Sequence, residues 1–317
     1  MQGRGCGKKA QGSQKAYFSQ KRYRRGRQVG RVVASRYEEI VCQRLYPGQT
    51  QLSQVLPELV QAAAEVLELD EAKRSQTLIR FDAGGGSAEA INTLLRAGYA
   101  IHGKDYAGKR TKKLTRTIKV WFSDPTDPNR QFAWLPQETQ LYHKPLYRLA
   151  IRTRHTKKRW RTGLLLSCLS PETVLYLTLQ PPTTDPQLLG LAYLALYDQR
   201  AGTIEISFKQ DCQGLAVRRR NKKRFAAQQI LLLLETLAHN CILWLRHKLA
   251  LLSPTLATCG LQRWVRELFH IPGLLLFDQS AHLSQIVLQK AHPLAPKLAL
   301  AWPALPRSNI LLILAQI

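Results

Sequence analysis

The residues of this chain that are best suited to chemistry are a few carboxylates among many cations. Asp82 follows the short apolar run Leu78–Phe81 and precedes Gly84, Gly85 and Gly86. A carboxylate at the C-terminal end of a strand lies where α/β sheets place their reactive groups. Hard divalent cations prefer oxygen ligands, so Asp82 is a candidate metal ligand. The alternative is a solvated aspartate in a turn.

Glu205 is the second candidate, in the segment YDQRAGTIEISFKQD. A helix there would place Arg200 about one turn before Glu205 and Lys209 one turn after it. Carboxylates that converge on two divalent cations can activate the attacking oxygen of a phosphodiester reaction and stabilise the leaving oxygen. The alternative is an ordinary row of ion pairs on a surface helix.

The elements around Asp82 have the pattern strand, helix, strand. The runs 78–81 and 99–102 are apolar, and Ser87 is a suitable N-cap for a helix between them. This order predicts a βαβ unit with two parallel strands. The three glycines lack the spacing of a P-loop or a dinucleotide-binding loop, so they predict a tight turn.

The rest of the chain gives a coarser pattern. Apolar spacing predicts two strands between residues 29 and 45 and a helix over 52–69 that is capped by Ser53. Residues 105–185 predict short strands between turns, which we interpret as a β-rich insertion and not as more of the α/β sheet. Helices are predicted over 186–212 and 225–252, and a hairpin over 274–288.

Composition indicates a polyanionic partner. The chain has 317 residues, of which 45% are hydrophobic, and a formal net charge of +26. Such a charge indicates binding to nucleic acid or to an anionic membrane surface. The most apolar helix is interrupted by Glu235, His239, Asn240 and Arg246, so we expect no membrane span and favour nucleic acid. His239 and Asn240 are expected to make buried hydrogen bonds.

The six cysteines are scattered and form no CxxC pair. This spacing argues against a zinc site and against a disulfide framework. Free thiols suit a reducing compartment, so a cytoplasmic location is expected, with nucleoid association when DNA is bound.

Two basic segments, 104–119 and 148–161, each hold seven Lys or Arg residues interleaved with aromatic residues. Their cations would contact phosphates, and the aromatic rings would stack on unpaired bases. A solvated loop with ordinary core aromatics is the alternative. The candidate DNA-binding residues of these segments are Lys104, Lys112, Lys113, Arg154, Lys158 and Arg159.

Four blocks of sequence together resemble the DDE transposases of bacterial insertion sequences, in the group with a β-rich insertion before the catalytic Glu. The blocks are GRQVGRVVASRYEEIVCQRLYPGQTQL (26–52), RFDAGGGS (80–87), YDQRAGTIEISFKQDCQGL (197–215) and KRFAAQQILLLLETLAHNCILW (223–244). The resemblance covers most of the chain. It implies an RNase H-like α/β fold, in which helices flank a mixed sheet and an insertion interrupts it. It also implies cutting and joining of DNA at the ends of the element, with Mg²⁺ or Mn²⁺ as cofactor.

The resemblance also implies roles for individual residues. Asp82 and Glu205 match the second catalytic Asp and the catalytic Glu, which makes both of them metal ligands. Tyr197, Arg200 and a following Lys, here Lys209, would hold DNA phosphates. The spacing between Arg200 and Glu205 is one residue longer than in the usual signature, and the position of its Lys falls on Cys212.

The family's first catalytic Asp has no counterpart in this sequence. It precedes a Gly-Lys-Lys segment that residues 7–9 match, whereas the first acid of the chain is Glu38. We therefore expect a truncated copy that lacks the first strand and is weakly active or inactive. Glu38 and Glu39 are the nearby acids that could substitute, but their positions predict surface acids.

We expect this protein to be a DNA transposase that acts on transposon ends and target DNA, with a possible homodimer on DNA and no membrane partner. The alternatives are a non-catalytic DNA-binding protein that regulates transposition and a basic RNA-associated structural protein. The expected segments are a basic flexible start (1–26), two parts of the RNase H-like core (27–104 and 186–252), the insertion (105–185) and a C-terminal region (253–317).

Overall fold

The computed structural model describes residues 9–18, 21–106, 108–156, 159–217, 222–305 and 310–316. The chain divides into two compact units. The first unit comprises residues 1–29, 33–48 and 205–317, and the second unit comprises residues 30–32 and 49–204.

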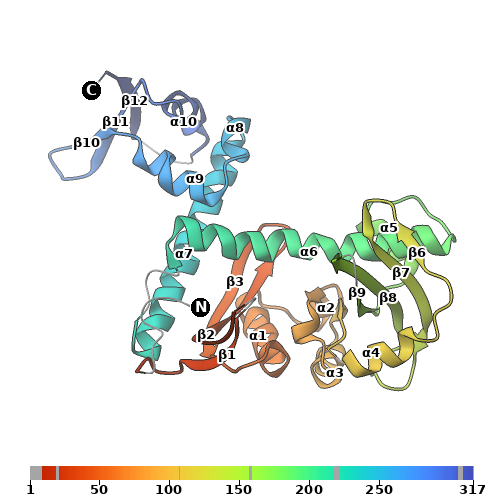
Figure 1. Cartoon of the computed structure of the whole chain (residues 1–317). Helices are drawn as coiled ribbons and strands as arrows, with labels where there is room; N and C mark the ends of the chain where they lie inside the picture. Colours follow the sequence, from red (N-terminus) through yellow and green to blue (C-terminus); the bar gives the residue numbers. More distant parts are fainter. Residues whose placement is uncertain are drawn as a thin grey trace. The chain divides into compact units, whose positions relative to one another are not determined.

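The second unit is built on a six-stranded mixed sheet with strand order β4-β5-β9-β8-β7-β6. Figure 1 shows the β6–β9 part of this sheet, in yellow and green. The strands are β4 Leu78–Phe81, β5 Ala100–Lys104, β6 Phe122–Asp124, β7 Asp127–Glu138, β8 Leu146–Thr156 and β9 Arg159–Ser167. β4 and β5 are parallel, and all the other pairs are antiparallel. A mixed sheet flanked by helices is consistent with the predicted RNase H-like fold.

Helices cover both faces of this sheet. They are α1 Leu52–Val66, α2 Glu71–Ser75, α3 Ala88–Arg96, α4 Gly108–Thr115, α5 Pro171–Leu177 and α6 Pro186–Gly214. One core joins α1 and α3 to a face that includes Phe81 and Leu164. The other joins α5 and α6 to the opposite face, which includes Leu165. The alternation of Leu164 and Leu165 between the two cores follows from the period of two along a strand.

The predicted βαβ unit is confirmed. Leu78 pairs with Ala100 and Phe81 with Gly103 in a parallel ladder, and α3 connects the two strands. The Ser87 side chain accepts a hydrogen bond from the Ala90 backbone N–H, as expected for an N-cap. The predicted cap of α1 is wrong, because Gln51 and not Ser53 occupies the N-cap position.

The prediction for residues 105–185 needs a correction. These residues do form short strands, but the strands extend the α/β sheet, because β9 pairs antiparallel with β5. The apolar run Leu164–Leu166 explains this: its residues are buried on both faces of the sheet, as in a central strand. The segment also contains α4 and α5.

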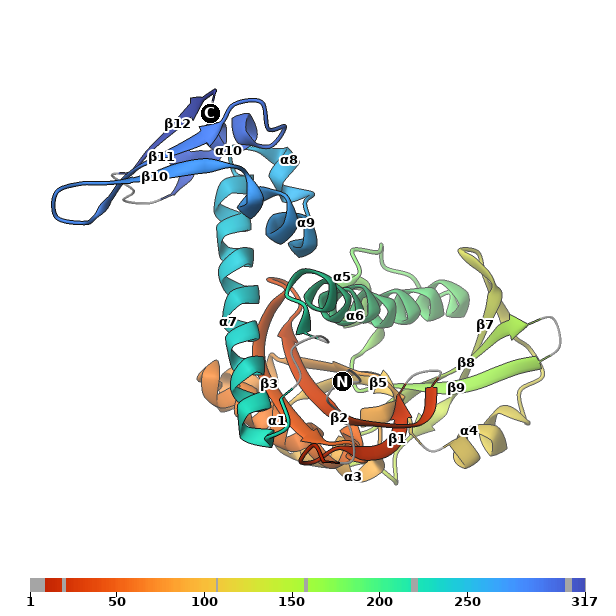
Figure 2. The ribbon, with the colours of Figure 1, turned by 60° about the vertical axis from the view of Figure 1, so that its left-hand side comes forward.

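The first unit contains a three-stranded sheet, β1-β2-β3, and the long helix α7, which runs beside β3 (Figure 2). These elements are β1 Gln14–Phe18, β2 Lys21–Ala34, β3 Glu39–Pro47 and α7 Phe225–Ala250. Residues 14–18 and 21–26 therefore belong to strands, although a flexible start was predicted over 1–26.

The C-terminal part of the first unit has its own apolar core around Trp264. Its sheet has the order β10-β11-β12, in which β10 and β11 form the predicted antiparallel hairpin and β12 runs parallel to β11. The elements are α8 Pro254–Ala257, α9 Leu261–Arg266, β10 Gly273–Phe277, β11 Leu283–Gln289, α10 Ala295–Ala301 and β12 Leu311–Ala315.

Helix α7 is the one helix of the described residues that is long and apolar enough to cross a membrane, by length and composition alone. That the chain has no membrane span stays a prediction. Two of the four polar residues that were expected to interrupt a span, Glu235 and His239, are buried inside the first unit. His239 Nδ1 lies 2.7 Å from Asp211 Oδ1, and Glu235 is also buried. A buried polar face of this kind is typical of a helix that packs within a folded unit.

Candidate functional site

Asp82 occupies the position that the sequence predicted, directly after β4. Its side chain is exposed, and its Oδ1 accepts a hydrogen bond from the Gly84 backbone N–H at 3.0 Å. This bond caps a short 3₁₀ turn, Ala83–Gly85. The carboxylate is therefore held in place at the end of the strand and keeps acceptor capacity on its second oxygen.

The glycine turn brings the end of β4 close to the end of β5. A Cβ atom on Gly86 would lie 1.8 Å from the carbonyl oxygen of Lys104, so only glycine fits there. The Tyr106 backbone N–H donates to the Gly86 carbonyl oxygen at 3.0 Å. The predicted tight turn is thus a close approach of two loops at the C-terminal edge of the parallel strands.

A cluster of cations surrounds Tyr197 of α6 within the second unit. Lys104 Nζ lies 4.6 Å from the centre of the Tyr197 ring, and the Arg200 guanidinium lies 5.0 Å from it. Arg200 also donates to the Tyr197 hydroxyl at 3.3 Å. Arg80, two residues before Asp82 on the same side of β4, donates to the Leu196 carbonyl oxygen at 3.0 Å.

Burial and mutual repulsion shift the pKa values of this cluster. Burial lowers the pKa of Lys104 and Arg200 lowers it further, whereas Asp198 and Asp82 oppose the shift. Burial also raises the pKa of the Tyr197 phenol, although Arg200 acts against this. Several cations held close together in a half-buried place favour an anionic ligand, such as a phosphate.

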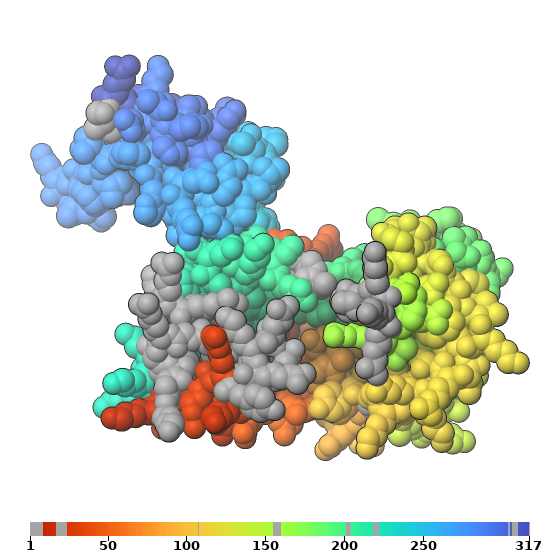
Figure 3. Space-filling model, in the orientation of Figure 1, coloured from red at the N-terminus to blue at the C-terminus, as the bar shows by residue number. Residues whose placement is uncertain are grey.

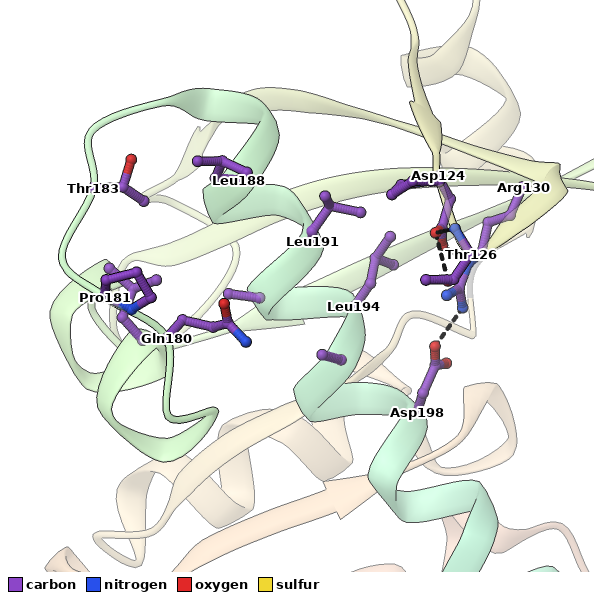
Figure 4. Close-up of a pocket in the computed structure, with 14 residues that line it drawn as sticks. Asp124, Thr126, Arg130, Gln180, Pro181, Thr183, Leu188, Leu191, Leu194 and Asp198 are labelled. Carbon is purple, nitrogen blue, oxygen red and sulfur yellow. Dashed lines mark hydrogen bonds and ion pairs between the residues drawn. The ribbon is translucent and has the colours of Figure 1, made fainter.

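Asp198 lies next to Tyr197 in the chain, but its carboxylate pairs with Arg130 at 2.5 Å. Arg130 also donates to the buried Asp124 at 2.6 Å (Figure 4). This bridge ties β7 to α6 beside a pocket of about 350 Å³ with a largely apolar wall. The Asp198 carboxylate therefore stabilises the contact between β7 and α6, whereas Asp82 is exposed.

Glu205 and Lys209 lie in the part of α6 that belongs to the first unit, and both side chains are exposed. The helix predicted around them is confirmed. That Glu205 and Asp82 bind the same ion stays a prediction. Glu38 and Glu39 are held by α7: Arg246 pairs with Glu38 at 2.6 Å, and the Trp244 indole donates to Glu39.

The residues of the two basic segments differ in their surroundings. Lys112 and Lys113 are exposed on α4, and Arg154 is exposed with its guanidinium 5.7 Å from the Trp160 ring. Lys158 lies outside the described residues, as do residues 7 and 8 of the Gly-Lys-Lys segment. Arg159 belongs to β9, but its side chain also lies outside the described part.

Other cations of the second basic segment make contacts within the sheet. Arg148 pairs with Glu138 at 2.8 Å. The Arg152 guanidinium lies between two indole rings, 4.2 Å from Trp121 and 4.8 Å from Trp160. These two arginines therefore stabilise the sheet, which the sequence pattern did not indicate.

In the described part of the chain, no three His, Cys, Asp or Glu side chains converge in a way that would hold a metal ion. The exposed carboxylate of Asp82 suits a hard cation as a single ligand, since it is an oxygen donor without an ion-pair partner among the described residues. A complete site needs further carboxylates, and Glu205 is the one that the sequence proposes.

Comparison with known proteins decides the family. The sequence model described as transposase DDE domain matches residues 4–241. The chain belongs to this transposase family. Members of the family generally depend on divalent metal and act on DNA, which agrees with an exposed Asp82 beside a cluster of cations. A search of curated proteins finds no match.

Sequence reasoning did not single out three residues around Asp82 and Tyr197: Arg80, Asp198 and the buried His102. Arg80 had a usable signal, because residues two apart on a strand share a face and Arg80 precedes Asp82 by two. Asp198 and His102 had none, since their partners come from other elements. His102 Nε2 donates to the Tyr193 carbonyl oxygen at 3.1 Å, which joins β5 to α6.

Proposed function

We propose that this transposase cuts and joins DNA at the ends of an insertion sequence in a metal-dependent reaction. The observation that carries the proposal is the exposed Asp82 at the end of β4, next to Lys104, Tyr197 and Arg200, in a chain of the DDE family. A carboxylate beside cations suits a reaction in which a metal ion and an anionic phosphodiester meet.

Asp82 and Glu205 would hold the ion, Mg²⁺ or Mn²⁺. When bound, such an ion neutralises charge on the reacting phosphodiester and activates the attacking oxygen. Tyr197, Arg200 and Lys209 would hold DNA phosphates near the scissile bond. The contact between the Arg200 guanidinium and the Tyr197 ring, at 5.0 Å, supports placing these two residues together in this role.

Glu38 and Glu39 are engaged by Arg246 and Trp244, so we expect neither of them to act as a third carboxylate of the metal site. A site with only two carboxylates would bind its ion less tightly and stabilise the leaving oxygen less well than one with three, and turnover would then be low. The partners are transposon ends and target DNA, with a homodimer on DNA and a location in the bacterial cytoplasm and nucleoid.

The substitution Asp82→Asn tests the proposal. Asparagine keeps an oxygen for the Gly84 N–H, so the turn is preserved while the negative charge is lost. We expect metal-dependent cleavage of DNA that carries the element's ends to disappear, and DNA binding to change little. Binding of Mn²⁺, followed by electron paramagnetic resonance, should weaken about tenfold or more.

Asp185→Asn is a matched control. Asp185 is exposed in the same unit and accepts a hydrogen bond from the Gln187 N–H, which asparagine can also do. This variant should keep both Mn²⁺ binding and cleavage. If Asp82→Asn also keeps both, Asp82 is not a metal ligand and the proposal is wrong.

The alternative is a DNA-binding protein that regulates transposition without cleaving DNA. Its support is the formal net charge of +26, which indicates a polyanionic partner whether or not the chain cleaves it. Specific binding to the terminal repeats by a wild-type chain that never cleaves them, even in Mn²⁺, would support this alternative over the catalytic one.

A further inference from the structure

Helix α4 presents a row of cations to solvent. Lys109, Lys112 and Lys113 are exposed on the helix, and Arg116 is exposed just after it. Their spacing of three, four and seven residues places all four on one face. The helix lies on the surface of the second unit, in the yellow region of the space-filling view (Figure 3).

The opposite face of α4 is attached to the sheet. Thr111 is buried, and Leu114 packs against the core that contains Leu164. The helix therefore has one apolar side and one cationic side, and its orientation decides whether the cations form a continuous outer surface.

A buried carboxylate, Asp105, also connects α4 to the sheet through Arg110. Arg110 Nε and one terminal nitrogen donate to Asp105 Oδ2 at 3.0 and 2.7 Å. The same guanidinium nitrogen donates to the Tyr142 hydroxyl at 2.8 Å. The Asp105 side chain is 1% exposed, and the Asp105 backbone N–H donates to the Leu164 carbonyl oxygen at 2.8 Å. Asp105 is thus held against β9 and connects α4 to the sheet.

We infer that Asp105 is a positioning residue for a phosphate-binding helix: it holds Arg110 inward so that the α4 row binds the DNA backbone. The inference rests on the proposed DNA-binding function and deepens it. Arg110 is the one cation of α4 whose charge is matched by a carboxylate among the described residues. The row would then contact phosphates, whereas Arg110 would contact none.

The direction in which Asp105→Asn changes the DNA affinity distinguishes this positioning role from an effect of total charge. Asp105→Asn removes a negative charge from a chain of net charge +26, so a change in total charge alone would tighten DNA binding. If Asp105 positions α4, the same substitution weakens DNA binding, because the four cations of the row no longer face the DNA phosphates together.

The experiment measures the affinity for a short labelled DNA duplex over about 50 to 200 mM salt. For Lys112→Ala with Lys113→Ala, we expect the slope of log affinity against log salt to fall by about two. For Asp105→Asn, we expect weaker binding and a slope lower by about one or more, although no cation is removed. Asp185→Asn, an exposed carboxylate of the same unit, should bind slightly more tightly with an unchanged slope.

Each outcome decides the inference. The inference is wrong if Asp105→Asn shows the same DNA affinity and salt slope as Asp185→Asn. It is also wrong if the double lysine variant keeps the wild-type salt slope. In both cases the proposed function stands as long as the wild type binds DNA. A wild-type chain that does not bind the duplex overturns the proposed function, and the inference with it.

A second variant covers the case in which Asp105→Asn does not fold, as judged by circular dichroism. Tyr142→Phe removes only the hydroxyl that accepts from Arg110 and keeps the buried ring. It changes no charge, so a weaker affinity with a reduced salt slope supports the inference. A wild-type slope and affinity in this variant contradict it.

Discussion

At the scale of single residues, the candidate site of this transposase is a small group of charges with different surroundings. Asp82 is exposed, whereas the nearby Asp198 is paired with Arg130. Two aspartates in one region therefore differ in their availability to a ligand because of their partners. The same division separates Lys112, which faces solvent, from Arg110, which is held by Asp105.

The buried His102 predicts that the stability of the protein depends on pH. Burial lowers the pKa of His102 from its ordinary 6.5 to about 4, the bond to the Tyr193 carbonyl acts against this, and Arg80 adds to it. Below about pH 6.5 the His102 ring is protonated in the unfolded chain, whereas in the folded chain it stays neutral down to about pH 4. The free energy of unfolding should therefore fall as pH decreases from 6.5 to 4. Each unit of pKa difference between the unfolded and folded chains contributes about 1.4 kcal/mol, so the total loss is on the order of 3 kcal/mol.

Denaturant unfolding at several pH values measures this effect. The variant His102→Gln should lose less stability than the wild type between pH 6.5 and 4. His282, whose side chain is 81% exposed, is the control, and His282→Gln should follow the wild-type profile. Equal profiles for all three chains would show that His102 does not contribute to the pH dependence.

At the scale of elements, α7 completes the edge of β3. The Asn240 side chain accepts from the Ile40 backbone N–H and donates to the Ile40 carbonyl oxygen, both at 3.0 Å. Gln229 accepts from the Leu45 N–H at 2.7 Å in the same way. Side-chain amides thus replace a neighbouring strand along this edge. The hydrogen bonds expected of Asn240 are present, although its side chain is half-buried and not buried.

Asn240→Ala should therefore destabilise the first unit. The substitution leaves the N–H and C=O of the buried Ile40 without their partner, at a cost of roughly 1–3 kcal/mol for each group. Cys241, the next residue, is exposed, so Cys241→Ser should change stability little. Unfolding in urea compares the two variants, and equal midpoints would refute this role of Asn240.

The element scale also explains why the insertion was misread. Short strands between turns predict β structure correctly, but the pattern does not say which sheet the strands join. That was decided by β9, whose residues Ser167 and Leu165 pair with His102 and Lys104 of β5. Pairing across more than sixty residues leaves no local signal in either strand.

At the scale of the whole molecule, the net charge of +26 predicts a strongly salt-dependent affinity for DNA. If six or more phosphates are contacted, affinity should fall by about a thousandfold or more between about 50 and 200 mM salt. Fluorescence anisotropy with a labelled duplex measures this. Binding that stays constant over that range would argue against phosphate contacts as its main source.

The sequence by itself determined the βαβ unit, the long helices, the place of Asp82 and the transposase family, because each depends on residues close together in the chain or on blocks of sequence. Only the tertiary structure decided that Lys104 and Arg200 meet at Tyr197 and that β9 joins β5. It also decided that Asp105, which lies outside α4, pairs with Arg110 of that helix. Periodicity shows which face a residue occupies within its own element, whereas the partner of a charge depends on how separate elements pack.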